Sequence, residues 1–367
     1  MRFRNNYVSA MECWKGRVDS ETDYDAFRWH QWVKPLDLAA GDDELKPFEG
    51  KLGIAFIGFC SEQGVKRNKG RVGTALAPDF IRGQMSNLPC AFLPEVALFD
   101  AGDILCDKIT MEEGQKQLGK AVEKLLSLNL FPIVLGGGHE TTFGHFLGQY
   151  HSLRGGEEVE KARRGKIDAA PQDGVVPDKA HLGIVNFDAH FDLRPYENGS
   201  SSGSMFRQMA DICREDGEPY HYLPLGIQQH SNTVQLFKVA KALGVEYILA
   251  KEVQTSGYAS ILEKVDLFMA GCSNAYVTVC TDVFSSAFAP GVSATQSLGL
   301  DPEDVLPIIK HIIRTRKVKG FDICEISPRF DQDNTTANLG AVIIFAVVST
   351  LCKMNNLDID LDHMTWI

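Results

Sequence analysis

The 367-residue sequence has no apolar run approaching the roughly 20 residues that a membrane-spanning helix needs. Its start, MRFRNNYVSAMECWKGR, lacks the apolar core of a signal peptide. The nine cysteines form no CxxC pair and are odd in number, which favours free thiols in a reducing compartment over a disulfide framework. These absences predict a cytoplasmic protein with no membrane partner.

Positive charge is also scarce. The formal net charge is −11, with 37 Lys and Arg against 48 Asp and Glu. Because a broadly acidic surface repels the phosphate backbone, the composition argues against a nucleic-acid partner. It does not exclude a small anionic substrate, which responds to the charges of its own pocket.

Eight apolar runs alternate with helical patterns along the chain. Several are apolar throughout, as in strands covered on both faces by helices, so we expect an α/β fold with a parallel sheet. The runs lie at 52–59, 96–102, 131–138, 181–188, 220–226, 245–250, 276–282 and 320–327. The clearest helical patterns lie at 111–129, 232–244 and 301–315.

Two segments interrupt this alternation. Residues 1–50 are polar and aromatic and predict an N-terminal arm packed on a single catalytic domain at 51–367. Residues 153–180 are charged and contain Gly and Pro, which favours a mobile surface insertion. Ligands of open parallel sheets bind outside the carboxyl ends of the strands, so polar residues following the strands are the functional candidates.

The first candidates follow two of these strands. In FPIVLGGGHE, three glycines precede His139, a pattern that taken alone favours a helix-opening loop, and GGGHETTFG lacks the third glycine of a dinucleotide site. In IVNFDAHFDLRP, the spacing of Asp188, His190 and Asp192 makes them converge on one side of an extended segment. Such groups are costly to bury unless a cation binds them, and these ligand types suit Mn²⁺, with Zn²⁺ as the alternative. The competing interpretation is a solvated turn whose aspartates cap a helix.

The next candidates follow two later strands. In YVTVCTD, Cys280 and Asp282 point to one side of the strand end, and Glu325 in DICEISPRF offers a carboxylate for a cationic substrate group or for a salt bridge. Two ions sharing bridging carboxylates fit the candidate ligands better than one ion, and such a pair can hold a bridging hydroxide. The residues therefore predict metal-assisted hydrolysis without identifying the substrate. The five candidate ligands are His139, Asp188, His190, Asp192 and Asp282.

These motifs, in this order, resemble the ureohydrolase superfamily of arginases, agmatinases and formimidoylglutamases. The resemblance runs from WKGR near residue 14 to about residue 350. The segments WKGRVDSE, RWHQWVKPL, GFCSEQGVKRNKGRVGTALAP, FDAHFDLRP and SSGSMF are most similar to the formimidoylglutamase branch. That branch hydrolyses N-formimidoyl-L-glutamate to L-glutamate and formamide in histidine degradation. The implied fold is arginase-like: a three-layer α/β/α sandwich around an eight-stranded parallel sheet.

The resemblance also implies a role for each candidate. His139, Asp188, His190, Asp192 and Asp282 match ligands of two Mn²⁺ ions per chain, with Asp188 bridging them. Glu325 matches the carboxylate that faces the amidine end of the substrate. A metal-bridging hydroxide would attack the amidine carbon, and Asp282 or a metal-bound water would pass a proton to the leaving amine. The superfamily commonly forms trimers or hexamers, which implies a homo-oligomer.

The glutamyl end of this substrate carries two carboxylates, so the site must supply local cations. The loop VKRNKGR and the residue after the metal motif provide Arg67, Asn68, Arg71 and Arg194, and arginine forks suit carboxylates. The alternative is that half of these side chains are ordinary surface groups. Because agmatine has no carboxylate, the basic loop argues against an agmatinase. An arginase- or agmatinase-type hydrolase remains the alternative among enzymes.

Cys280 departs from the superfamily pattern, which has Asp-x-Asp at this place. A soft thiolate is expected to weaken Mn²⁺ and admit Zn²⁺ or iron more readily. A metal-impaired, non-catalytic protein of the same fold is therefore a second alternative. Cys60 ends the first strand at the same edge, so a disulfide with Cys280 is conceivable if the Cα atoms approach within roughly 7 Å. The competing interpretation is that Cys60 packs in its own loop.

Overall fold

The computed structural model describes residues 6–41, 44–164 and 181–359 of the chain. The strands are β1 Tyr7–Val8, β2 Lys34–Pro35, β3 Leu52–Cys60, β4 Val96–Leu105, β5 Phe131–Leu135, β6 Leu182–Phe187, β7 His221–Ile227, β8 Ile248–Leu249, β9 Asn274–Cys280 and β10 Val318–Cys324. The α-helices are α1 Trp29–Trp32, α2 Gln63–Arg67, α3 Ala77–Met85, α4 Met111–Ser127, α5 Thr141–Arg164, α6 Met205–Glu215, α7 Val234–Ala242, α8 Ala250–Thr255, α9 Tyr258–Ala270, α10 Pro302–Arg314 and α11 Thr335–Met354. Short 3₁₀ helices lie at Met11–Cys13, Tyr24–Ala26, Thr74–Leu76, Gln229–Ser231, Thr281–Val283 and Pro328–Phe330.

The strands form one sheet. Within the described residues it has ten strands in the order β1-β4-β3-β5-β10-β9-β6-β7-β8, and β2 pairs with β4 outside this path. Every pairing is parallel except that of β1 with β4. The eight strands expected from the apolar runs are all present. The sheet exceeds eight strands because the N-terminal arm adds β1 and β2, which are too short to show a period.

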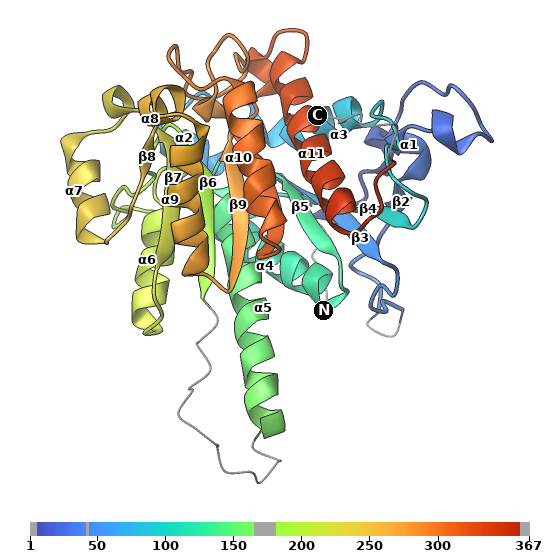
Figure 1. Ribbon diagram of the computed structural model, residues 1–367, viewed down its shortest axis with the longest axis horizontal. Helices are drawn as coiled ribbons and strands as arrows, with labels where there is room; N and C mark the ends of the chain where they lie inside the picture. Colours follow the sequence, from blue (N-terminus) through green and yellow to red (C-terminus); the bar gives the residue numbers. More distant parts are fainter. Residues whose placement is uncertain (1–5, 42–43, 165–180, 360–367) are drawn as a thin grey trace.

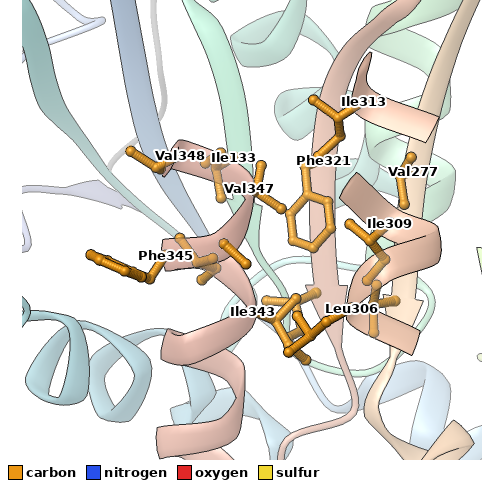
Figure 2. Packing of buried hydrophobic residues seen from close by; sticks show 14 of the residues in the cluster. Ile133, Val277, Leu306, Ile309, Ile313, Phe321, Ile343, Phe345, Val347 and Val348 are labelled. Carbon is orange, nitrogen blue, oxygen red and sulfur yellow. The ribbon is translucent and has the colours of Figure 1, made fainter. Parts of the chain in front are cut away.

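Helices cover both faces of the sheet (Figure 1), which confirms the expected three-layer α/β/α architecture. One face packs against α3, α9, α10 and α11, where Ile133, Val277 and Phe321 of the strands meet Ile309 and Ile343 of the helices (Figure 2). The opposite face packs against α4, α5, α6 and α7. Removing this apolar surface from water is the main stabilising contribution to such a fold.

Helix boundaries follow the capping residues. The Thr110 hydroxyl accepts the N–H of Glu113 at 3.2 Å, and the Glu113 side chain accepts the N–H of Thr110, so α4 begins with a capping box. Asp301 accepts the N–H of Glu303 at 2.9 Å, and Pro302 at the first helical position starts α10. The helices expected at 111–129, 232–244 and 301–315 are therefore confirmed to within two residues at either end.

The N-terminal arm joins the main core. Trp29 is fully buried and its ring stacks on Phe56 of β3 with centroids 5.8 Å apart. The indole N–H of Trp14 donates to Asp100 Oδ2 at 2.7 Å, and the same carboxylate pairs with the buried guanidinium of Arg82. The arm thus contributes an apolar contact to β3 and a polar contact to β4.

Two expectations about surface and membrane segments need revision. The segment 153–180, expected as a mobile insertion, begins inside α5, which continues to Arg164, whereas residues 165–180 lie outside the described residues. The expectation that no apolar run reaches membrane length is wrong for α11, which has 20 residues and a mean hydropathy of 1.8 in its most apolar window. Since 72% of that window is buried inside the molecule, core packing accounts for its composition.

Candidate metal centre

Four neighbouring strands end together at the site. Leu135 of β5 pairs with Ile323 of β10, which pairs with Val279 of β9, which in turn pairs with Phe187 of β6. In parallel strands these register partners share one level of the sheet, so the residues that follow them emerge side by side. The candidate ligands and Glu325 all come from these four strand ends.

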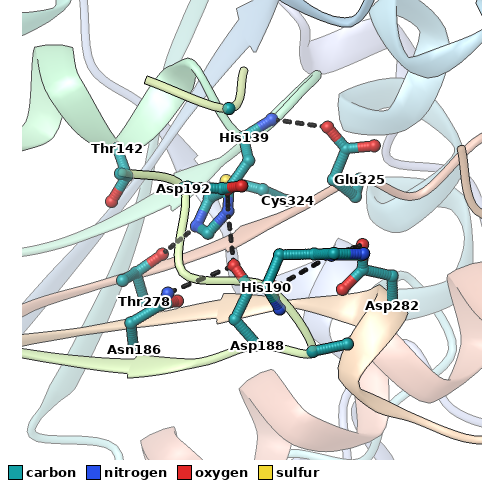
Figure 3. Close-up of polar contacts among 12 residues, drawn as sticks. His139, Thr142, Asn186, Asp188, His190, Asp192, Thr278, Asp282, Cys324 and Glu325 are labelled. Carbon is teal, nitrogen blue, oxygen red and sulfur yellow. Dashed lines mark hydrogen bonds and ion pairs between the residues drawn. The ribbon is translucent and has the colours of Figure 1, made fainter. Parts of the chain in front are cut away.

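His139 lies at the centre of the first ligand group. Its Nδ1 is 3.0 Å from Asp188 Oδ2 and 3.2 Å from Asp192 Oδ2 (Figure 3). Asp192 has a φ of 48°, a left-handed conformation that is uncommon outside glycine and clusters at functional sites. Ligand atoms of His139, Asp188 and Cys280 lie within 4.8 Å of one another, so one ion could contact all three.

His190 lies in the second group. Its Nδ1 is 3.1 Å from Asp282 Oδ2 and 3.5 Å from Asp188 Oδ1, and ligand atoms of these three residues also lie within 4.8 Å of one another. The backbone N–H of His190 donates to Asp188 Oδ1 at 2.7 Å. Asp188 therefore presents one carboxylate oxygen to each group, as a bridging ligand does.

The donor set fits a pair of divalent cations. It combines three buried carboxylates with two imidazoles and a thiol, and no Lys or Arg among the described residues forms an ion pair with these carboxylates. Asp282 Oδ1 is buried without a hydrogen-bond partner in the described chain. Buried polar atoms are rarely left unpaired, so this oxygen is available to a cation or a water molecule.

The buried carboxylates and imidazoles shift one another's pKa values strongly. Burial by itself lowers an imidazole pKa, but Asp188 and Asp192 hold the pKa of His139 well above its ordinary value. Asp282 and Asp188 have the same effect on the pKa of His190. Burial and the nearby charge of Asp188 raise the pKa of Asp192 to about 6. Because a cation replaces protons on such ligands, its binding is expected to release protons.

Burial also raises the pKa of the Cys280 thiol well above its ordinary value, and the negative charges of Asp188 and Asp282 act in the same direction. A thiolate at this position therefore needs a nearby cation. The sulfur of Cys280 lies close to the ligand atoms of His139 and Asp188. Deprotonation of Cys280 therefore depends on a cation bound in the first group.

Glu325 lies beside the first group. Its Oε1 accepts the backbone N–H of His139 at 2.8 Å, and its Oε2 accepts the hydroxyl of Ser293 (Figure 3 shows the first contact). Burial raises its pKa to about 8, although the Ser293 hydrogen bond acts in the opposite direction. Its φ of 69° is also left-handed. A strained, buried carboxylate with no ion pair in the described chain is suited to a cationic substrate group.

The disulfide considered from the sequence is absent. Cys60 and Cys280 are both free. Cys60 is on β3 and Cys280 on β9, with β5 and β10 between them. Three strand spacings place the Cα atoms about 14 Å apart, beyond the roughly 7 Å that a disulfide allows. The backbone carbonyl of Cys60 accepts the N–H of Cys106 at 3.1 Å, which ties the end of β3 to the residue that follows β4.

The residues expected to bind the substrate carboxylates lie in two regions, one around Gly203 and one around Val292. Arg67 forms an ion pair with Glu112, so its charge is partly neutralised. Asn68 and Arg194 lie together around Gly203, where a Cβ would be 2.9 Å from Asn68 Oδ1 and 3.0 Å from Arg194 Cδ. Among the described residues, Arg194 has no ion pair, and its exposed side chain follows the metal motif directly.

Arg71 lies near Glu325 and not beside Gly203. Its guanidinium donates to the carbonyl of Val292 and lies 4.3 Å from the centroid of the Phe330 ring. Val292 precedes Ser293, whose hydroxyl binds Glu325. Arg71 is therefore connected through one short loop to the carboxylate expected to face the amidine.

Four polar residues that the sequence did not single out form hydrogen bonds to the candidate ligands or to Glu325. They are Asn186, Thr278, Ser293 and Gln296. Asn186 and Thr278 lie two positions before Asp188 and Cys280 on the same strands, so the alternation of strand side chains could have identified both. Ser293 and Gln296 lie in an irregular loop, where no such periodicity exists.

The fold and the site together define a class of protein. The model of the Arginase family matches residues 52–349, and the chain belongs to this family. It is similar to the formimidoylglutamase of Clostridium tetani, with 54% identity over 345 residues that cover 94% of this chain and 96% of that protein. It is 39% identical over 329 residues to the formimidoylglutamase of Geobacillus thermodenitrificans, covering 90% and 92% of the two chains. The resemblance noted in the sequence is thus confirmed.

Solved structures show the same fold. The crystal structure of formimidoylglutamase from Bacillus subtilis superposes with a TM-score of 0.71 at 22% identity, covering 92% of this chain and 96% of that one. A formiminoglutamase from Trypanosoma cruzi with Mn²⁺ superposes with a TM-score of 0.67 at 22% identity, covering 84% and 97%. At this identity the likeness establishes the architecture.

Proposed function

We propose that the chain hydrolyses N-formimidoyl-L-glutamate to L-glutamate and formamide, using two Mn²⁺ ions, in histidine degradation in the cytoplasm. The observation that carries the proposal is a pair of ligand groups sharing Asp188 beside the buried carboxylate of Glu325. The 54% identity to a formimidoylglutamase over nearly the whole chain supports this choice of substrate. One ion would bind His139, Asp188, Asp192 and Cys280, and the other would bind Asp188, His190 and Asp282.

The residues of the chain orient the substrate and move its protons. Two divalent ions in these groups would supply Lewis acidity and lower the pKa of the attacking water. Glu325, fixed by the His139 N–H and the Ser293 hydroxyl, binds the cationic amidine through charge-assisted hydrogen bonds. Water adds to the formimidoyl carbon and the C–N bond to glutamate breaks. Asp282 passes the proton lost by the water to the leaving amine, through the otherwise unpartnered Oδ1.

The direct test is a product assay on Mn²⁺-loaded protein. We expect equal amounts of formamide and L-glutamate from N-formimidoyl-L-glutamate, and neither urea from L-arginine nor urea from agmatine. Release of urea without any formamide would instead identify an arginase- or agmatinase-type hydrolase.

We assign the two substrate carboxylates to Arg67, Asn68, Arg71 and Arg194. Arg71 and Arg194 have no ion pair in the described part of the chain, whereas Arg67 is paired with Glu112. An arginine guanidinium presents two parallel N–H groups to a carboxylate, which gives both charge and orientation. Arg71 and Arg194 should therefore contribute most to substrate binding.

Replacing either of these arginines should weaken substrate binding. Arg71→Ala and Arg194→Ala should each raise KM about 10- to 100-fold with a smaller change in kcat, because a charge-assisted hydrogen bond is lost. Arg67→Ala should have a smaller effect. Arg214→Ala, which removes a surface guanidinium paired with Asp211, is the matched control and should leave KM unchanged. An unchanged KM in both Arg71→Ala and Arg194→Ala would refute their role.

Cys280→Asp should tighten Mn²⁺ binding about tenfold or more, since a hard carboxylate replaces a soft thiolate in the first group. The affinity for Zn²⁺ should rise less, so the preference for Mn²⁺ over Zn²⁺ should increase. Calorimetric titration of both ions measures the change. Cys272→Ser, which alters a buried thiol at the opposite end of β9, should leave both affinities unchanged. Equal Mn²⁺ affinities for Cys280→Asp and the natural protein would remove Cys280 from the ligands.

A further inference from the structure

A row of buried polar side chains lies one level below the ligands. Asn186 of β6, Thr278 of β9 and Asp322 of β10 are register partners in the sheet, and all three are fully buried. Val277 and Val279, on either side of Thr278, point into the apolar core on the opposite face. Buried polar groups are costly unless hydrogen-bonded, so the partners of this row indicate what it does.

Thr278 contacts the imidazole of His139. Its Oγ1 is 3.1 Å from Nε2, while Nδ1 of the same ring faces Asp188 and Asp192 (Figure 3). A histidine that binds a cation through one nitrogen donates the N–H of the other to a fixed acceptor. With Thr278 as the acceptor, the proton stays on Nε2 and Nδ1 is directed at the first ligand group.

Asn186 contacts the shared carboxylate of Asp188. Its Nδ2 donates to Asp188 Oδ2 at 3.1 Å and to the hydroxyl of Tyr222 at 3.0 Å. The Tyr222 hydroxyl in turn donates to the carbonyl of Phe191 at 3.1 Å, so the amide is held from two sides. Both Asn186 and Thr278 are neutral, so they orient their partners without changing the charge of the site.

We propose that Thr278 and Asn186 are positioning residues that direct His139 Nδ1 and the Asp188 carboxylate toward the cations. This inference rests on the proposed metal centre and is independent of the substrate. Neither residue is a ligand in either group, so each acts through the side chain that it contacts.

The test compares Thr278→Val with Thr278→Ser. Valine keeps the shape of threonine without the hydroxyl, whereas serine keeps the hydroxyl. Thr278→Val should lower Mn²⁺ affinity about 10- to 100-fold in calorimetric titration, and Thr278→Ser should restore most of it. Asn186→Leu should have an effect of similar size. Thr350→Val, which removes a buried hydroxyl on α11 bonded to Ala346, should leave the affinity unchanged.

A second measurement uses the natural protein and does not depend on how a variant folds. Nitrogen-15 chemical shifts of His139 in the Zn²⁺-loaded protein should show the proton on Nε2 and the metal on Nδ1. Metal on Nε2, or Mn²⁺ affinity in Thr278→Val equal to that of the natural protein, would overturn the inference. Failure of the natural protein to bind Mn²⁺ or Zn²⁺ would instead overturn the metal centre itself. A change of substrate alone would leave the inference standing.

Discussion

Asp188→Asn is expected to remove divalent cations from both ligand groups at once. Asp188 gives one oxygen to the His139 group and the other to the His190 group, so a single neutral amide weakens both. Removing one charge from a buried ionic cluster typically costs about 3–5 kcal/mol, so Mn²⁺ affinity should fall by roughly 10²- to 10⁴-fold. Elemental analysis after dialysis should then find less than one ion per chain, and formamide release should be lost.

The matched control is Asp266→Asn. Asp266 pairs with His311 at 2.6 Å on the surface, so this variant also converts a carboxylate–imidazole pair to an amide–imidazole pair. It should retain metal and activity. Full Mn²⁺ content in Asp188→Asn would show that Asp188 does not bridge the two groups.

Glu325→Gln should lower kcat/KM by about 10²- to 10³-fold, because Glu325, the proposed buried partner of the cationic amidine, would lose its charge. Glutamine keeps the size of the side chain and an oxygen that can accept the His139 N–H, so the fold and the Mn²⁺ content should persist. The loss should appear in the rate of formamide release at full metal occupancy.

Glu252→Gln serves as the control, since Glu252 is a surface carboxylate paired with Lys264. Its kcat/KM should equal that of the natural protein. If Glu325→Gln retained full kcat/KM, the amidine would have to be bound by another group. If it lost metal instead, Glu325 would be acting on the ligands through the His139 backbone.

The main fold could be predicted because buried parallel strands appear in the sequence as continuous apolar runs. Runs such as 52–59 and 131–138 are apolar throughout, and helices such as α10 begin with capping residues. The short strands β1 and β2 form no such run, since two residues show no period. The apolar composition of α11 did not reveal its place, because a buried core helix and a membrane helix share that composition.

The site could be predicted as a set of residues at one edge of the sheet, but not as a geometry. Asp188 and Asp282 could be chosen as candidate ligands because carboxylates directly after apolar strands are unusual. His139, which taken alone favoured a helix-opening loop, became a candidate only together with them. The order of the strands in the sheet could not be predicted from the sequence, and that order separates Cys60 from Cys280. The ion pair between Arg67 and Glu112 could not be foreseen either, because it joins segments that only tertiary packing brings together.

The candidate site lies on β5, β10, β9 and β6 in the middle of the sheet, so cation binding there would affect the stability of the whole fold. Residues as far as 186 positions apart, such as His139 and Glu325, meet across these four strands. An unfolded chain cannot gather them, because closing such long loops costs conformational entropy. Cations bound here would act as a cross-link through the middle of the sheet, adding their binding free energy to the stability of the native state alone. The concentration of free metal ions would then affect the free energy of unfolding as well as the activity.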